Sequence, residues 1–265
     1  MKTLIMAALA TGMTVQVQAA PVTAPKPTVV LVHGAFADSS SWNGVVTILQ
    51  RHGYRVIAAA NPLRSVRTDA DAVSDIVKSI KGPVVLVGHS YGGSVISEAA
   101  EGRPNVKALV YVAAFAPDEG ERLGEVTPES KDSILNTALV QYNYPTGRDG
   151  ETAVEFGINP ALLPEAFAAD LSPETTALMA ATQRPVAAAA FSDASGPPAW
   201  RKLPSWAVVA TGDKAAGADL VRSMARRAGA DIVEVEGSHV IMISQPQAVT
   251  DHIVKAAQAT VGSGR

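Results

Sequence analysis

Residues 84–93 read Val-Val-Leu-Val-Gly-His-Ser-Tyr-Gly-Gly. Four apolar residues, three of them valine, run directly into the pentapeptide Gly88-His89-Ser90-Tyr91-Gly92. A Gly-x-Ser-x-Gly between a buried strand and a helix is typical of a sharp turn that holds the serine in a strained backbone conformation. The pattern therefore predicts Ser90 as a nucleophile. The alternative is an ordinary glycine-rich turn with a serine that caps the next helix.

Around this stretch, short apolar runs alternate with longer helical patterns, as in βαβ units with a parallel sheet covered on both faces. Six strands are predicted: Thr28–His33, Arg55–Ala59, Val84–Val87, Ala108–Ala113, Trp206–Ala210 and Ile232–Val235. Helical spacing of apolar residues predicts five helices: Trp42–His52, Asp69–Ile80, Ser94–Ala100, Ala218–Ala228 and Pro246–Ala259. Thr68 is the predicted N-cap of the second helix. The predicted fold class is therefore α/β, with a mostly parallel, doubly wound sheet.

The stretch 117–203 breaks this alternation. It is rich in Pro, Ala, Glu and Asp, and it shows no convincing strand. Its clearest features are helical patterns at Pro164–Asp170 and Pro173–Ala190. We therefore predict a helical cap over 117–203, inserted into a core formed by residues 21–116 and 204–265.

The first twenty residues have the features of a targeting segment. Lys2 precedes an apolar run from Leu4 to Val15, and Gln18-Ala19-Ala20 offers small residues to signal peptidase. The run is shorter than the roughly 20 apolar residues that a membrane span needs. We expect a signal peptide over 1–20 and a secreted or periplasmic mature protein without a stable membrane anchor. An anchor or a cytosolic tail is the alternative.

The composition favours a small-molecule partner. Of 265 residues, 47% are hydrophobic, which is enough for one sizeable core. The 22 basic and 25 acidic residues form no block of like charge, so nucleic acid is not an expected partner. The absence of cysteine excludes disulfides, thiolate catalysis and cysteine-bound metal.

A serine nucleophile needs a base, and the chain offers five histidines: His33, His52, His89, His239 and His252. His52 and His252 fall at or inside helices. His33 ends a strand, and the side chain of His89 is expected to point away from Ser90. His239 follows the last strand, in a loop at the same sheet edge as Ser90. It is the predicted general base.

The base in turn needs an acid that orients its ring and stabilises the imidazolium. Asp213 follows the penultimate strand at the same edge, and it gives the chain order Ser, Asp, His. Asp118, after the fourth strand, is the rival, because an acid can also come from that position. Asp219 is expected in or capping a helix, and Asp231 at the opposite end of the sheet.

Two backbone N–H groups are also needed where negative charge develops in the reaction. Ala35, directly after the first strand, and Tyr91 are the predicted donors of this oxyanion hole. An ordinary strand-ending turn is the alternative for the segment around Ala35. Phe36 and Phe115 are predicted to line a mostly apolar substrate pocket. Packing beneath the cap is the alternative for Phe115.

These motifs resemble the α/β-hydrolase superfamily along essentially the whole mature length. The likeness is strongest to the small esterase branch of plant methyl esterases, hydroxynitrile lyases and bacterial esterases. It rests on Val32-His33-Gly34-Ala35 with Trp42, on residues 88–93, on Thr211-Gly212-Asp213-Lys214, and on Gly237-Ser238-His239 with Ser244-Gln245-Pro246. The lyases of the branch look as though they need a lysine where this chain has Val240. Related dehalogenases and epoxide hydrolases place an aspartate where it has Ser90. The resemblance thus implies an esterase.

The expected function is a serine hydrolase of carboxylesterase type that acts on esters of small, largely apolar compounds. Ser90, Asp213 and His239 would carry the reaction, without a metal or an organic cofactor. A C–C or amide hydrolase with the same triad, and a non-catalytic ligand-binding protein of the same fold, are the alternatives.

Overall fold

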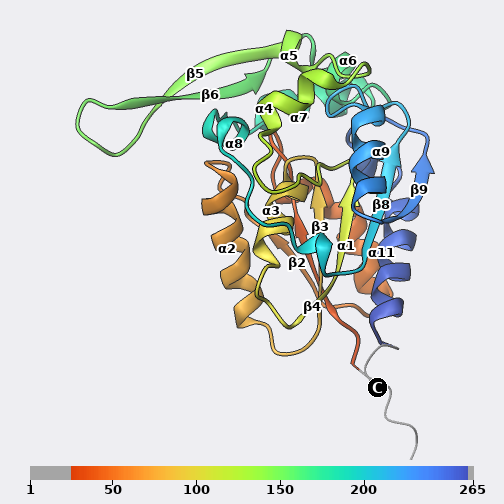
Figure 1. The fold of residues 1–265 in the computed structure, drawn as a ribbon. Coiled ribbons are helices and arrows are strands. Elements are labelled where there is room, and N and C mark those ends of the chain that lie inside the picture. Colours follow the sequence, from red (N-terminus) through yellow and green to blue (C-terminus); the bar gives the residue numbers. More distant parts are fainter. Residues whose placement is uncertain (1–24, 262–265) are drawn as a thin grey trace, which may run out of the picture.

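The computed structural model describes residues 25–261, so the predicted signal peptide lies outside the described residues. A six-stranded parallel sheet forms the centre (Figure 1). Its strands are β1 Thr28–Val32, β2 Val56–Ala59, β3 Val84–His89, β4 Val106–Val112, β8 Ser205–Ala210 and β9 Asp231–Val235. They lie in the order β2-β1-β3-β4-β8-β9. Every residue of β1, β3 and β8 is buried, because both faces of the sheet are covered. The six predicted strands are confirmed.

Helices flank this sheet, and the five predicted ones are present. They are α1 Asn43–Arg51, α2 Val66–Ser79, α3 Gly92–Ala99, α9 Ala218–Arg227 and α11 Pro246–Val261. α1 packs against α11, and α2 packs against α3 (Figure 1). The prediction of Thr68 as the N-cap residue of α2 was wrong. The N-cap residue is Ser65, which has an extended backbone and whose side chain accepts a hydrogen bond from the N–H of Thr68. The helix therefore begins at Val66.

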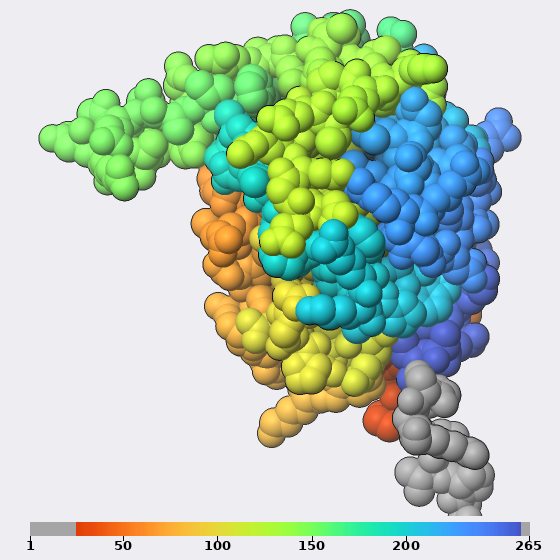
Figure 2. Space-filling view, viewed as in Figure 1, coloured from red at the N-terminus to blue at the C-terminus, as the bar shows by residue number. Residues whose placement is uncertain are grey.

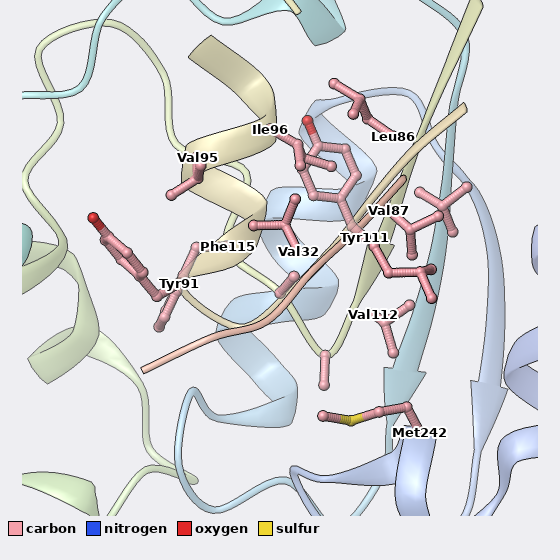
Figure 3. Packing of buried hydrophobic residues seen from close by; sticks show 14 of the residues in the cluster. Val32, Leu86, Val87, Tyr91, Val95, Ile96, Tyr111, Val112, Phe115 and Met242 are labelled. Carbon is pink, nitrogen blue, oxygen red and sulfur yellow. The ribbon is translucent and has the colours of Figure 1, made fainter. Parts of the chain in front are cut away.

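The core lies between the strands and these helices. Figure 3 shows part of it, where Val32 and Leu86 of the strands lie with Ile96 of α3. All three side chains are fully buried. Within residues 25–261, no helix is long and apolar enough to cross a membrane.

Between β4 and β8 the chain forms a cap, and the prediction that this cap is purely helical was wrong. A second, antiparallel sheet is present, in the order β5-β6-β7. Its strands are β5 Leu139–Pro145, β6 Thr152–Ile158 and β7 Val186–Ala187. Apolar and aromatic residues alternate along it, at Val140, Tyr142 and Tyr144 in β5 and at Val154, Phe156 and Ile158 in β6. This period of two is a strand signal that the Pro- and Ala-rich composition of the whole stretch had obscured.

The cap also contains five short α-helices: α4 Leu123–Val126, α5 Leu135–Ala138, α6 Leu163–Phe167, α7 Pro173–Thr182 and α8 Ala189–Ser192. The predicted helix Pro173–Ala190 ends at Thr182 because Pro185 cannot continue it and also disfavours helical geometry at Arg184. The β5–β6 hairpin extends away from the body of the molecule (Figures 1 and 2). Three single-turn 3-10 helices, Ser39–Trp42, Thr127–Glu129 and Ala199–Arg201, and α10 Ile241–Ser244 lie in connections.

Candidate active site

Ser90 stands in the turn between β3 and α3. Its φ is +53°, in the left-handed region that residues other than glycine rarely adopt. Three backbone hydrogen bonds hold it there. Its N–H donates to the carbonyl of Val112 at 3.3 Å, and its carbonyl accepts from the N–H of Gly93 at 2.9 Å and of Phe115 at 3.2 Å. The strained turn is thus fixed from both β4 and α3.

Two glycines bring the end of β1 against this turn. A Cβ added at Gly92 would lie 2.5 Å from the carbonyl oxygen of Val32, and one added at Gly34 would lie 2.6 Å from the Cβ of Ser90. Neither approach leaves room for a side chain. The segment that contains Ala35 therefore lies directly beside Ser90.

His239 and Asp213 form a buried pair at the carboxyl ends of β9 and β8. Nδ1 of His239 lies 2.8 Å from Oδ2 of Asp213, and both residues are 1% exposed. The other carboxylate oxygen accepts the N–H groups of Ala215 at 2.8 Å and Ala216 at 3.0 Å. A carboxylate oxygen can only accept a hydrogen bond, so the contact with Oδ2 assigns the donor role to Nδ1 of His239 and the acceptor role to its Nε2.

His89 links this pair to Ser90. Its Nε2 donates to the carbonyl of His239 at 3.0 Å, and the two ring centroids are 4.7 Å apart. Complete burial, followed by the neighbouring His239, holds the pKa of His89 well below its usual range. His89 is therefore a neutral residue that fixes the His239 loop beside the serine turn. The sequence predicts only that its side chain points away from Ser90, so this link between the two loops was not foreseen.

The rival candidates for base and acid are bound to other partners. His33 is buried and bound on both nitrogens, to Asn61 N–H and to the Gly34 carbonyl. Asp118 forms an ion pair with Arg201 at 2.5 Å. Asp219 accepts hydrogen bonds from Ser130 and Lys131. Asp213 is the acid that the structure brings to His239.

A cavity of about 200 Å³ opens at Ser90, and Ala35, Phe36, Tyr91 and Phe115 also line it. The remaining wall includes Leu135, Leu139, Phe156 and Phe191, all from the cap. None of the lining residues is charged, and four of the five phenylalanines of the chain take part. The four cap residues were missed by the sequence analysis, because no local pattern tells which cap side chains face the core.

Tyr91 is also anchored through its side chain. Its hydroxyl donates to Oδ2 of Asp69 at 2.9 Å, and both residues are fully buried. Burial raises the pKa of Asp69 above its usual value, although the Arg64 N–H and the Tyr91 hydroxyl act against this shift. Asp69 thus ties α2 to Tyr91, a predicted donor of the oxyanion hole.

In the described part of the chain, no group of three or more acidic residues or histidines is arranged so that it could bind a metal ion.

Fold and site together define the class of the protein. Residues 29–252 match the alpha/beta hydrolase family, and the chain belongs to that family. This membership agrees with the parallel sheet, the strained serine turn and the acid–histidine pair at one sheet edge.

Two proteins of similar sequence and one crystal structure of similar fold can be compared with the chain over most of its length. The chain is 27% identical to esterase PIR7B of Oryza sativa subsp. japonica, with 86% of this chain and 94% of that protein covered. It is 28% identical to salicylic acid-binding protein 2 of Nicotiana tabacum, with 86% and 96% covered. The crystal structure of polyneuridine aldehyde esterase has the same fold, with a TM-score of 0.75 at 21% identity over 87% of this chain and 99% of that one. The family and these relatives support a hydrolase, and the esterase names support ester hydrolysis.

Proposed function

We propose that this protein is a serine hydrolase that cleaves carboxylic esters of small, largely apolar compounds through an acyl-enzyme. The observation that carries the proposal is the buried His239–Asp213 pair, which a hydrogen bond to His89 holds next to the strained Ser90, and Ser90 lines an uncharged cavity. The similarity to esterase PIR7B, of which 94% is covered, supports ester hydrolysis.

In the proposed mechanism, Oγ of Ser90 attacks the ester carbonyl carbon while Nε2 of His239 accepts the hydroxyl proton. Asp213 stabilises the resulting imidazolium through Nδ1–H. The backbone N–H groups of Ala35 and Tyr91 bind the oxyanion. His239 then returns the proton to the leaving alcohol. In the second half, water repeats these steps on the acyl-enzyme and releases the acid.

The cavity supports the substrate class. Placing a charged group among phenylalanine and leucine side chains would cost several kcal/mol of lost hydration. Neutral esters do not meet this cost, and the aromatic walls favour aromatic or branched acyl groups. The volume of about 200 Å³ limits the part that enters to a small group.

Ser90→Ala tests the nucleophile. We expect hydrolysis of p-nitrophenyl butyrate to fall by at least ~10³-fold and labelling by a fluorophosphonate probe to disappear. Ser94→Ala, a buried serine one turn further along α3, is the matched control and should keep both. Wild-type protein that is neither labelled nor active would favour the ligand-binding alternative. Full activity in Ser90→Ala would refute the assignment of Ser90 as the nucleophile.

We also propose that residues 1–20 direct export and are removed. The mature protein recovered from a host carrying the full gene should begin near Ala20 by N-terminal sequencing. A mature chain that still begins at Met1 would contradict this.

A further inference from the structure

Asp170 lies in the cap between α6 and α7, but its carboxylate binds the loop that carries His239. Oδ2 accepts a hydrogen bond from the Ser238 backbone N–H at 2.9 Å, and Oδ1 accepts one from the Ser238 hydroxyl at 2.5 Å. Partial burial would raise the pKa of this carboxyl, but the hydrogen bonds from Ser238, with a smaller effect of the Ser244 hydroxyl, bring it below its usual value. An ionised acid of the cap therefore holds both donors of the residue that directly precedes the proposed base.

The contact between Asp170 and Ser238 depends on a glycine at the preceding position, Gly237. A Cβ added at Gly237 would lie 2.8 Å from Oδ2 of Asp170 and 2.4 Å from Cδ1 of Ile241. Glycine at this position leaves the space that the carboxylate occupies. The carbonyl of Gly237 also accepts the N–H of Gly212 at 3.0 Å, which joins the loop to the segment that carries Asp213.

The same part of the cap also touches the imidazole directly. Phe167, the last residue of α6, is 2% exposed, and its ring centroid lies 4.9 Å from that of His239. With His89 also packed on this ring, the imidazole is restricted by side chains from both the core and the cap. Ser238 is only 4% exposed, so loss of Asp170 would leave two buried donors without these bonds.

We propose that Asp170 is a positioning residue for His239: from the cap, it fixes Ser238 and thereby holds the imidazole in the orientation that Ser90 requires. This inference rests on the proposed function, since it takes His239 as the general base. It gives the cap a part in the chemical step in addition to its part in the pocket wall.

Asp170→Ala is the first test, with p-nitrophenyl butyrate as substrate. We expect kcat to fall about 10- to 100-fold, because a small displacement of a catalytic group is costly. His239 acts in both acylation and deacylation, so both steps slow together and KM should stay within about twofold. Asp170→Asn keeps an oxygen that can accept the Ser238 N–H, and we expect it to restore most of the lost kcat.

A double-mutant cycle identifies the contact through which Asp170 acts. Ser238→Ala removes one of the two hydrogen bonds and should lower kcat less than Asp170→Ala does. The double variant should resemble Asp170→Ala, because the hydroxyl of Ser238 has already lost its partner. Additive losses would mean that the two residues act independently and would overturn the proposed route.

Glu165→Ala, which removes an exposed acid from α6, is the matched control and should leave kcat unchanged. Thermal unfolding of each variant separates misfolding from misplacement. Asp170→Ala with kcat within twofold of wild type, or with its loss confined to KM, would refute the positioning role. If Ser90→Ala is inactive in the same assay, that result leaves the proposed function intact; activity in Ser90→Ala would refute the proposed function itself.

Discussion

At the scale of single residues, Ser90 shows how a backbone conformation limits the choice of side chain. Its φ of +53° is costly for any residue with a Cβ, by about 1–3 kcal/mol. Glycine adopts this region without that cost. The proposed role of the hydroxyl explains why a serine remains at a position where the backbone favours glycine.

We therefore expect two inactive variants to differ in stability. The free energy of unfolding of Ser90→Gly should be about 1 kcal/mol larger than that of Ser90→Ala, because only glycine relieves the backbone strain. Urea denaturation of the two proteins, followed by circular dichroism, measures this difference directly. Equal or reversed stability would show that the turn is not strained.

Much of the candidate site follows from the positions of residues along the chain. Asp213 and His239 each follow a predicted strand, and parallel strands end at one edge, so their meeting could be expected. Asp170, Asp69 and Phe167 could not. Each acts across a contact between segments far apart in the sequence, and each lies in a stretch whose local pattern shows only a helix or its end.

At the scale of elements, the β5–β6 hairpin has two parts with different roles. Leu139 and Phe156, near the body, line the cavity at Ser90. Tyr142, further out on β5, is 45% exposed. The hairpin therefore contributes to the pocket only at its base.

Phe156→Ala should enlarge the acyl pocket without touching the proposed catalytic residues. We expect the ratio of kcat/KM for p-nitrophenyl octanoate over acetate to rise by about 10-fold, since methylene groups in an apolar pocket have effects of this order. Tyr142→Ala, on the exposed part of the same hairpin, serves as control. An unchanged ratio in Phe156→Ala would mean that the acyl group binds elsewhere.

Elements were predicted well where the pattern was unbroken. β1 and β3, for example, are fully buried, valine-rich runs, and such runs have few alternative structures. In the cap, short elements change type every few residues. There the period of two in β5 and β6 and the break at Pro185 were the informative signals, and the overall composition was misleading.

At the scale of the whole molecule, buried histidines link stability to pH. His33, His89 and His252 each have a pKa lowered chiefly by burial. Below the unfolded pKa of about 6.5, the unfolded chain binds protons that the folded protein does not. Proton binding to the unfolded chain therefore lowers the free energy of unfolding as the pH falls below about 6.5, and it has no effect well above that pH. Burial raises the pKa values of Asp69 and Glu98, so the folded protein binds protons at these two acids more readily than the unfolded chain does. Their effect on stability is therefore opposite to that of the histidines, and it occurs at the lower pH where carboxyl groups titrate.

We expect the free energy of unfolding to fall between pH 7.5 and 5.5, by up to ~1.4 kcal/mol per pH unit for each histidine that remains neutral. Urea titrations across this range measure the slope. His252→Gln, whose side-chain N–H can still donate to the Asp231 carbonyl, should flatten it. A slope that this variant leaves unchanged would exclude His252 from the effect.

The bond from Asp170 to Ser238 also bears on how new enzymes could be built from this one. Caps of this kind look like exchangeable modules, because each is one continuous insertion between two strands of the sheet. Here, however, the insertion supplies a contact on which the proposed base depends. A cap transplanted from a relative would change the pocket and also remove that contact. Recombination at these boundaries would succeed only when the donor cap brings an equivalent acid, or when Ser238 is redesigned with it.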